Sequence, residues 1–551
     1  MARIVVEKQF GVQSAILAKS WKSMTTSRSY APGGSYESSA ATLRGGRPAP
    51  AGGAPLFPPR KRLFMASLLF AFLFSQANWE AAAGCALLLL LFNTQILPWL
   101  DLEAMQSPPG LLLNKAGELL TNKGWGILAN HGGGVILYPI SVLALVLLYR
   151  YHLYVAAAAW AIMALGDGTA TIIGEAARRS SVVENVQVRG PGPAWRREVA
   201  ATLAGRIAAA WRRKIAATLP WNREKTWVGS LGLVLAGTAA AYLLTRWIAP
   251  AMPAYKTLMV CAAGALLGAV VEGLPLALDD NITVPLAAGA FMFCAFFMER
   301  TALASNLPYL GRRMFLALAA NLAFAFIAYA FKAASVSGAI CGFLLGTAIY
   351  LGYGYKSFVL LFAFVLLGSV ATRLGLEKKA ARGIAERRGG ARSWREASAN
   401  LTAAAFFAIL VITTHHEAAF LLAMVAALAE AAGDTISSEI GQWISSRAYL
   451  ITTLQRVPAG ENGGISLAGT VAGFAASASI VGLSVGLKLC GPYRIGGPAI
   501  AFAAAAMGNL FDSVLGATLE RQGLVTNGMV NFAGTSVAGG LALGLALRWG
   551  L

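Results

Sequence analysis

The stretch AAFLLAMVAALAEAAGDTISSEIG, residues 418–441, decides the fold of this chain. It is apolar over a length that crosses a bilayer as a helix, and it ends in the polar pattern Asp434-x3-Ser438-x2-Gly441. On a helix these three positions share one face, because residues four and seven apart lie within about 40° of each other. A carboxylate at the centre of a membrane helix costs at least about 2.5–3.5 kcal/mol, so Asp434 predicts a functional site.

The same polar pattern occurs in an earlier apolar run, and two more patterns are repeated after it. Each pair keeps the same order: Asp167-x3-Thr171-x2-Gly174 with Asp434-x3-Ser438-x2-Gly441, Asn222-x3-Thr226-x2-Gly229 with Asn462-x3-Ser466-x2-Gly469, and Gly268-x3-Glu272 with Gly508-x3-Asp512. The Asn and the acid of the last two patterns are 50 residues apart in both copies. Ordered pairs with a conserved spacing predict two homologous halves.

The composition places these motifs in a membrane. The chain has 551 residues, of which 57% are hydrophobic and 13% charged, with a mean hydropathy of +0.61. Several apolar stretches exceed the roughly 18 residues that a transmembrane helix needs. We therefore expect an all-α, polytopic membrane protein of about 15 spans, built from two parallel halves.

The net charge of +20 is concentrated in two loops that set the expected orientation. Residues 176–226 hold eleven Lys/Arg against three acids, and 373–395 hold eight against two. Basic loops stay on the cytoplasmic side of a membrane. An even number of expected spans separates the loops, so the N-terminus and both motif sets are predicted to face the cytoplasm.

Three regions are expected along the chain. Residues 1–60 are basic and rich in Ser, Ala, Gly and Pro, which is typical of a disordered tail. Residues 63–330 and 333–551 form the two membrane domains. The five cysteines show neither metal-ligand spacing nor a disulfide pattern.

Carboxylates beside hydroxyls and basic loops favour chemistry on a Mg²⁺-nucleotide. Mg²⁺ takes hard oxygen ligands and brings phosphates with it, and Lys or Arg can neutralise phosphate oxygens. The sequence has no G-x-x-x-x-G-K-[ST] loop, so a P-loop enzyme is excluded. The second substrate is expected to come from the bilayer, and no nucleic acid partner is expected.

The motifs carry a resemblance to two kinase families. Gly166-Asp-Gly-Thr-Ala170, Leu219-Pro-Trp-Asn-Arg-Glu-Lys-Thr-Trp-Val-Gly-Ser230 and Asp279-Asp-Asn-Ile-Thr-Val-Pro285 resemble the phytol kinases, which belong to the polyprenol kinase and CDP-diacylglycerol synthase group. Asp434-Thr-Ile-Ser-Ser-Glu-Ile-Gly441, Pro458-Ala-Gly-Glu-Asn-Gly-Gly-Ile-Ser466 and Asp512-Ser-Val-Leu-Gly-Ala-Thr518 resemble the phytyl-phosphate kinases. The resemblance covers about 120–300 and 333–551.

The resemblance implies two consecutive kinase steps in one polypeptide, from a prenol to its monophosphate and then to its diphosphate. It implies CTP, or UTP, as the phosphoryl donor, together with Mg²⁺. Its implied catalytic residues are Asp167, Glu272, Asp434 and Asp512, of which Asp167, Asp434 and Asp512 would bind the metal. The implied substrate and nucleotide contacts are Asn222, Lys225, Thr226, Asp280, Asn281, Lys378, Arg388, Ser438, Glu439, Asn462 and Asn531.

Other interpretations stay open at this point. A lipid cytidylyltransferase uses the same nucleotide and metal but attacks the α-phosphate, and a parallel-repeat transporter also fits two halves. Asp280 and Asn281 could only cap a helix that begins near Ile282. Glu439 lies about 140° from Asp434 around the helix, which also fits a structural salt bridge. The sequence does not identify the prenol or the oligomeric state.

Overall fold

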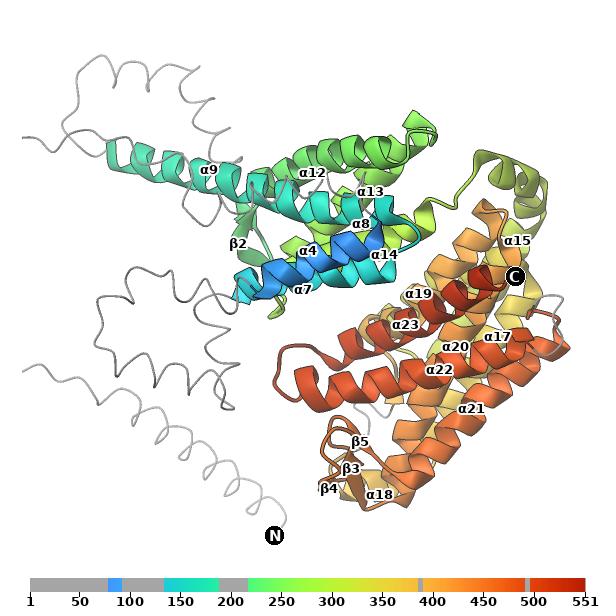
Figure 1. Ribbon diagram of the computed structural model, residues 1–551. Helices are drawn as coiled ribbons and strands as arrows, with labels where there is room; N and C mark the ends of the chain where they lie inside the picture. Colours follow the sequence, from blue (N-terminus) through green and yellow to red (C-terminus); the bar gives the residue numbers. More distant parts are fainter. Residues whose placement is uncertain (1–77, 92–132, 188–216, 385–389, 491–495, 551) are drawn as a thin grey trace, which may run out of the picture. The chain divides into compact units, whose positions relative to one another are not determined.

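The computed structural model describes residues 78–91, 133–187, 217–384, 390–490 and 496–550. The expected tail at 1–60 and Arg388 lie outside these residues. The described chain is mostly helical (Figure 1), which confirms the predicted all-α, polytopic membrane fold. Eleven of its helices are long and apolar enough to cross a membrane, and three shorter ones are also apolar. The total of about 15 spans stays a prediction, because parts of the chain are outside the description.

The first group of helices surrounds one hydrophobic core. Its elements are α4 (Trp79–Leu91), α7 (Gly133–Leu148), α8 (Leu153–Ala161), the π-helical segment η4 (Ile162–Asp167), α9 (Gly168–Gln187), α12 (Trp227–Ile248), α13 (Ala254–Gly273) and α14 (Asp280–Ala295). The core is formed mainly by α8 and η4, whose residues from Val155 to Ala164 are all buried. Asp167 is the last residue of η4, so it directly follows the most buried part of this group.

The second group surrounds a separate hydrophobic core. Its elements are α15 (Arg300–Ala330), α16 (Val336–Tyr353), α17 (Tyr355–Arg373), the short α18 (Leu376–Ala381), α19 (Trp394–Thr413), α20 (Glu417–Ile444), α21 (Leu467–Gly486), α22 (Gly496–Leu515), the π-helical η6 (Gly516–Glu520) and α23 (Asn527–Arg548). Because α15 packs against α16 and α19, it shares contacts with helices beyond the expected boundary at 330–333. That boundary stays a prediction.

Helix α20 is the centre of the second group. It packs against α17, α19, α21, α22 and α23, and every residue from Ala419 to Gly433 is buried. A helix that is apolar all round is stable only when other helices enclose it. Residues 418–441 therefore belong to the core helix of this bundle, and Asp434 directly follows its fully buried part.

Small residues let α21 approach α20 closely. A Cβ atom on Gly473 would lie 2.8 Å from the Ser437 Cβ and 2.9 Å from the Gly433 carbonyl oxygen. Real Cβ atoms do not approach other atoms this closely, so the contact requires glycine. Such backbone contact is a common means of packing membrane helices.

Two small sheets, which the sequence analysis did not anticipate, precede α12 and α21. Strand β1 (Thr218–Leu219) pairs antiparallel with β2 (Asn222–Thr226). Strand β3 (Arg447–Leu450) pairs with β4 (Arg456–Pro458) and with β5 (Gly464–Ile465), which gives the order β4-β3-β5. Both sheets therefore lie in the chain just before a repeated motif helix.

We predict that Gly473→Ala destabilises the protein by about 1–3 kcal/mol, because overpacking forces α20 and α21 apart. Gly482→Ala on the same helix is the matched control, since a Cβ there meets nothing within 4 Å. The control should leave stability unchanged or raise it by up to about 1 kcal/mol, the gain in helix propensity. Thermal unfolding of the purified protein in detergent measures both variants. Equal tolerance of the two substitutions would refute the close contact.

Candidate functional sites

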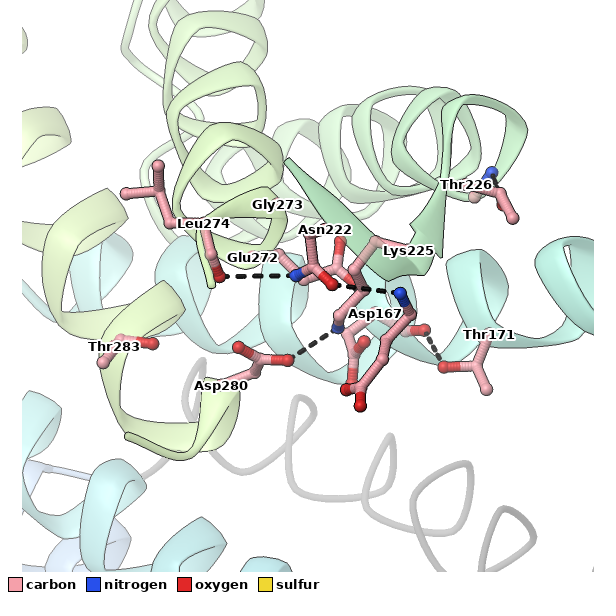
Figure 2. A network of polar contacts seen from close by, with 12 residues as sticks. Asp167, Thr171, Asn222, Lys225, Thr226, Glu272, Gly273, Leu274, Asp280 and Thr283 are labelled. Atoms are coloured by element: carbon pink, nitrogen blue, oxygen red, sulfur yellow. Dashed lines mark hydrogen bonds and ion pairs between the residues drawn. The ribbon is translucent and has the colours of Figure 1, made fainter. Parts of the chain in front are cut away.

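A polar cavity of about 340 Å³ lies among the elements of the first helix group (Figure 2). Its polar lining includes predicted site residues from five elements, η4, α9, β2, α13 and α14. These residues are Asp167, Thr171, Asn222, Lys225, Glu272, Asp280 and Asn281. Of the residues that the resemblance implied for the first site, six line this cavity, and Thr226 lies outside the lining. Leu274, Leu276 and Leu278 line the same cavity.

Lys225 is the electrostatic centre of this cavity. Its Nζ atom lies 2.7 Å from Glu272 Oε1 and 2.6 Å from Asp280 Oδ2. Burial alone would lower the pKa of Lys225, but the two carboxylates outweigh it and raise the pKa above its usual value. Lys225 therefore stays protonated across the physiological pH range. The Glu272 side chain is only 4% exposed, so its charge depends on this partner.

The β1–β2 hairpin holds Lys225 in place by two contacts with the end of α13. Trp221 Nε1 donates to the Gly273 carbonyl at 3.0 Å, and Asn222 Nδ2 donates to the Leu274 carbonyl at 3.5 Å. Asn222, a predicted substrate contact, thereby also ties the hairpin to the segment that follows Glu272. Figure 2 shows the contact between Asn222 and Leu274.

Helix α14 is capped by a neighbour of the two residues for which a capping role had been left open. Asp279, not Asp280, is the N-cap of α14, and it accepts hydrogen bonds from the Asn281 backbone and side-chain nitrogens at 2.8 and 2.7 Å. Asp280 is free to pair with Lys225 instead. Asn281 combines a capping contact with a place in the cavity lining.

The repeated Asn-x3-Thr/Ser-x2-Gly pattern forms the same local structure in both groups. The Thr226 hydroxyl accepts from the Gly229 N–H at 3.1 Å and caps α12, and the Ser466 hydroxyl accepts from the Gly469 N–H at 3.1 Å and caps α21. Thr226 is buried, so its hydroxyl serves the helix start. This correspondence agrees with the repeat in the sequence, and the homology of the two halves stays a prediction.

The second predicted site is held by hydrogen bonds between three helices of the second group. Asn531 Nδ2, on α23, lies 3.3 Å from Asp434 Oδ2 on α20 and 3.3 Å from Asn400 Oδ1 on α19. The positively charged Arg392 side chain attracts the Asp434 carboxylate electrostatically. The Arg392 backbone is fixed by hydrogen bonds with Ala333 and Ser335. Asn400 was not among the predicted site residues, because its contact depends on tertiary packing.

Glu430 is a second acid that the sequence analysis did not select. It precedes Asp434 by one helical turn and is 1% exposed, although no hydrogen-bond donor reaches either of its carboxylate oxygens in the described structure. Electrostatic interaction couples it to both Asp434 and Asp512. The signal that could have found it is an acid four residues before Asp434, within an apolar run. The first half has Met163 at the corresponding position.

Glu439 forms a buried salt bridge, the alternative that its position on the helix had left open. Lys379 Nζ, on α18, lies 2.5 Å from Glu439 Oε2, and the two side chains are 1% and 7% exposed. The same amino group donates to the Thr372 carbonyl at 3.0 Å. With a third contact, to the Ala371 carbonyl at 3.4 Å, these interactions hold Lys379 inside the protein, and the ion pair connects α18 to α20. Neither charge faces solvent.

The remaining predicted contacts of the second site lie at its periphery. Lys378, Ser438 and Asn462 are exposed. In the described residues, no hydrogen bond joins them to the side chains of Asp434, Asn531 or Asn400. Their roles as substrate or nucleotide contacts stay predictions.

Mg²⁺ fits the carboxylate clusters when oxygen atoms from other molecules complete its ligand shell. Within the described ranges, no three His, Cys, Asp or Glu side chains are arranged to hold a metal ion by themselves. A Mg²⁺ ion that arrives with a nucleotide needs only one or two carboxylates, because phosphate oxygens and water complete its ligand shell. Asp512 Oδ2 is buried and without a donor, as expected for an oxygen that accepts such a cation.

The family match lies within the second helix group. Residues 319–540 match the family described as integral membrane protein DUF92. The uncharacterized membrane protein sll0875 of Synechocystis is 34% identical over 205 residues, which are 37% of this chain and 78% of that protein. The uncharacterized membrane protein MJ0933 of Methanocaldococcus jannaschii is 34% identical over 202 residues, 37% of this chain and 81% of that protein. Protein VTE6, chloroplastic, of Arabidopsis thaliana is 35% identical over 216 residues, 38% of this chain and 64% of that protein. No solved structure matches.

We predict that Lys379→Met and Glu439→Leu each destabilise the protein by about 3–5 kcal/mol, because each leaves one buried charge without its partner. The double variant Lys379→Met/Glu439→Leu should recover most of that loss, since it removes both charges. Thermal unfolding of the three variants in detergent measures the coupling. A double variant as unstable as the sum of the two single variants would contradict a buried ion pair.

Proposed function

Because the chain belongs to the DUF92 family of integral membrane proteins, we propose that its second helix group is a phosphotransferase that acts on a prenyl monophosphate. In this proposal a nucleoside triphosphate, CTP or UTP, donates its γ-phosphoryl group and the product is the prenyl diphosphate. The proposal rests on Asp434 of α20, Asp512 of α22 and Asn531 of α23, which we call the Asp434 cluster. Arg392 interacts electrostatically with Asp434, and the outer surface of the bundle is apolar.

The chemistry of this step suits the residues present. The nucleophile is a phosphate oxygen of the prenyl monophosphate, which is already anionic at neutral pH and needs no general base. One O–P bond forms to the γ-phosphorus while the bond to the β-phosphate oxygen breaks, and the nucleoside diphosphate leaves. Catalysis of such a transfer depends mainly on positioning and on neutralising charge.

The chain's own groups divide these tasks. Asn531 holds the Asp434 carboxylate through its Nδ2 atom, which fixes the orientation of one acid at the site. Arg392 supplies positive charge for phosphate oxygens, and its guanidinium group stacks on the Phe364 ring 5.5 Å away. When bound, Mg²⁺ would supply charge neutralisation of the nucleotide phosphates, held by Asp434 and Asp512. The apolar helix surfaces admit a prenyl chain from the bilayer.

The first helix group carries a second candidate function, the phosphorylation of the free prenol. The supporting observation is the cavity that holds Asp167 and the Lys225–Glu272–Asp280 ion pairs and is also lined by Leu274, Leu276 and Leu278. An alcohol is a poor nucleophile until a base accepts its proton, and we assign this role to Asp167, which lines the cavity outside the ion pairs of Lys225. Together the two groups would convert a prenol into its diphosphate, with both sites facing the cytoplasm.

We predict that Asp434→Asn lowers the conversion of prenyl monophosphate to diphosphate about 10²–10³-fold, because it removes a charge and keeps the shape of the side chain. Glu417→Gln, an exposed acid at the start of the same helix, is the matched control and should keep full activity. Product analysis after incubation with CTP, Mg²⁺ and prenyl monophosphate measures both. Unchanged turnover in Asp434→Asn would exclude this site.

Asp167→Asn is expected to separate the two candidate reactions. It should lower monophosphate formation from the alcohol about 10²–10³-fold and leave monophosphate conversion nearly intact, because the two reactions use different carboxylates. Assays with prenol and with prenyl monophosphate as alternative substrates give the two rates, and the Asp434→Asn variant provides the converse pattern. Loss of the same step in both variants would mean that the halves build one shared site.

A further inference from the structure

Four buried oxygen atoms in the second helix group have no hydrogen-bond donor among the residues that the structure describes. They are Glu430 Oε1, Glu430 Oε2, Asp512 Oδ2 and Asn531 Oδ1, and we call these three residues the acceptor cluster. A buried acceptor without a donor is unfavourable, and a charged one is more so. Four such atoms in one region favour a common partner other than the residues that the structure describes.

The acceptor cluster converges on two glycines. A Cβ atom on Gly534 would lie within 3.0 Å of Glu430 Oε1 and 3.3 Å from the Asp512 Cβ, so both acids border the same point on α23. A Cβ on Gly508 would lie 2.8 Å from the Glu430 Cγ. Glycine at both positions makes room for the Glu430 carboxylate between α22 and α23. Any side chain at either position would occupy the space that the carboxylate uses.

The orientation of the Asn531 amide leaves its oxygen atom, a hydrogen-bond acceptor, as the atom that Asn531 contributes to the cluster. Its Nδ2 atom faces the Asp434 and Asn400 oxygens, both of which are acceptors. The amide nitrogen is therefore fixed on that side, and Oδ1 must point elsewhere as an acceptor. Two carboxylates and one amide oxygen form a set of hard oxygen ligands, which is the set that Mg²⁺ and similar ions prefer.

We propose that Glu430, Asp512 and Asn531 form a binding site for a divalent cation, one helical turn nearer the start of α20 than Asp434. When both carboxylates are ionised they carry two negative charges, which a single divalent ion neutralises. A buried charge with no partner is unfavourable, so the cation stabilises the bundle as well as occupying the site. Because Asp512 is also one of the acids that the proposed function assigns to Mg²⁺, the site rests in part on that proposal. Binding of the ion without a nucleotide distinguishes the two.

Mn²⁺ binding to the purified full-length protein in detergent tests this site, with nucleotide and lipid substrate absent and KCl in excess. Electron paramagnetic resonance of free Mn²⁺ gives the affinity, and thermal unfolding with and without Mn²⁺ reports the linked stability. The wild-type chain should bind Mn²⁺ and unfold at a higher temperature when it is present. Glu430→Gln should weaken Mn²⁺ binding at least about tenfold and remove the thermal shift.

Two comparisons make the result decisive. Glu417→Gln, the same substitution at the exposed start of α20, should bind Mn²⁺ like the wild type. Without metal, Glu430→Gln should unfold at the wild-type temperature or above it, because it removes a buried charge and keeps the shape of the side chain. Wild-type Mn²⁺ affinity in Glu430→Gln would overturn the proposal and assign a bound proton to Glu430 instead. Absence of Mn²⁺ binding by the wild-type chain would overturn it as well.

Discussion

Burying carboxylates inside a bundle of apolar helices is the constraint on which the rest of this structure depends. An ionised carboxylate in such surroundings is stable only with a cation or hydrogen-bond donors beside it. The chain meets this requirement in the first helix group with Lys225, which pairs with Glu272 and Asp280. In the second group it uses Lys379 for Glu439. In the described part of the chain, Glu430 and Asp512 keep oxygens without a donor, and this contrast is the basis of the cation site that we propose.

Helix packing brings these acids to their places. The residues of α20 from Ala419 to Gly433 are fully enclosed, which forces the neighbouring helices α21, α22 and α23 to approach closely. Glycines at Gly433, Gly473, Gly508 and Gly534 permit this approach, and two of them also make room for the Glu430 carboxylate. The packing that encloses the core helix is thus the packing that assembles the acceptor cluster. A substitution that loosens the bundle is expected to disturb both.

Part of this arrangement could be predicted from the sequence. Apolar length and composition were enough for the fold class. The repeated motifs selected Asp167, Glu272 and Asp434, and the family resemblance added Asn531; the structure places these residues within polar clusters. The repeat also predicted equivalent local structure at Thr226 and Ser466, although their hydroxyls cap helices in the structure. All of these features depend on residues that are close to one another in the sequence.

The features that were missed depend on contacts between residues far apart in the chain. The partner of Glu439 is Lys379, 60 residues earlier, and no local pattern selects it over the adjacent Lys378. In the sequence, Glu430 is a single polar residue in an apolar run. Only the structure shows that Gly508 and Gly534 border its side chain. Strands as short as β1 and β5 have no periodicity to detect.

The central claim is that phosphoryl transfer, not nucleotidyl transfer, takes place at the Asp434 cluster. Both reactions would use the same nucleotide and the same ion, but they attack different phosphorus atoms. Wild-type protein incubated with prenyl monophosphate, Mg²⁺ and CTP labelled at either the γ- or the α-phosphate separates them directly. Our account predicts that the γ-label appears in the lipid product and the α-label stays with the nucleoside diphosphate. Transfer of the α-label to the lipid would contradict it and assign the site to a cytidylyltransferase.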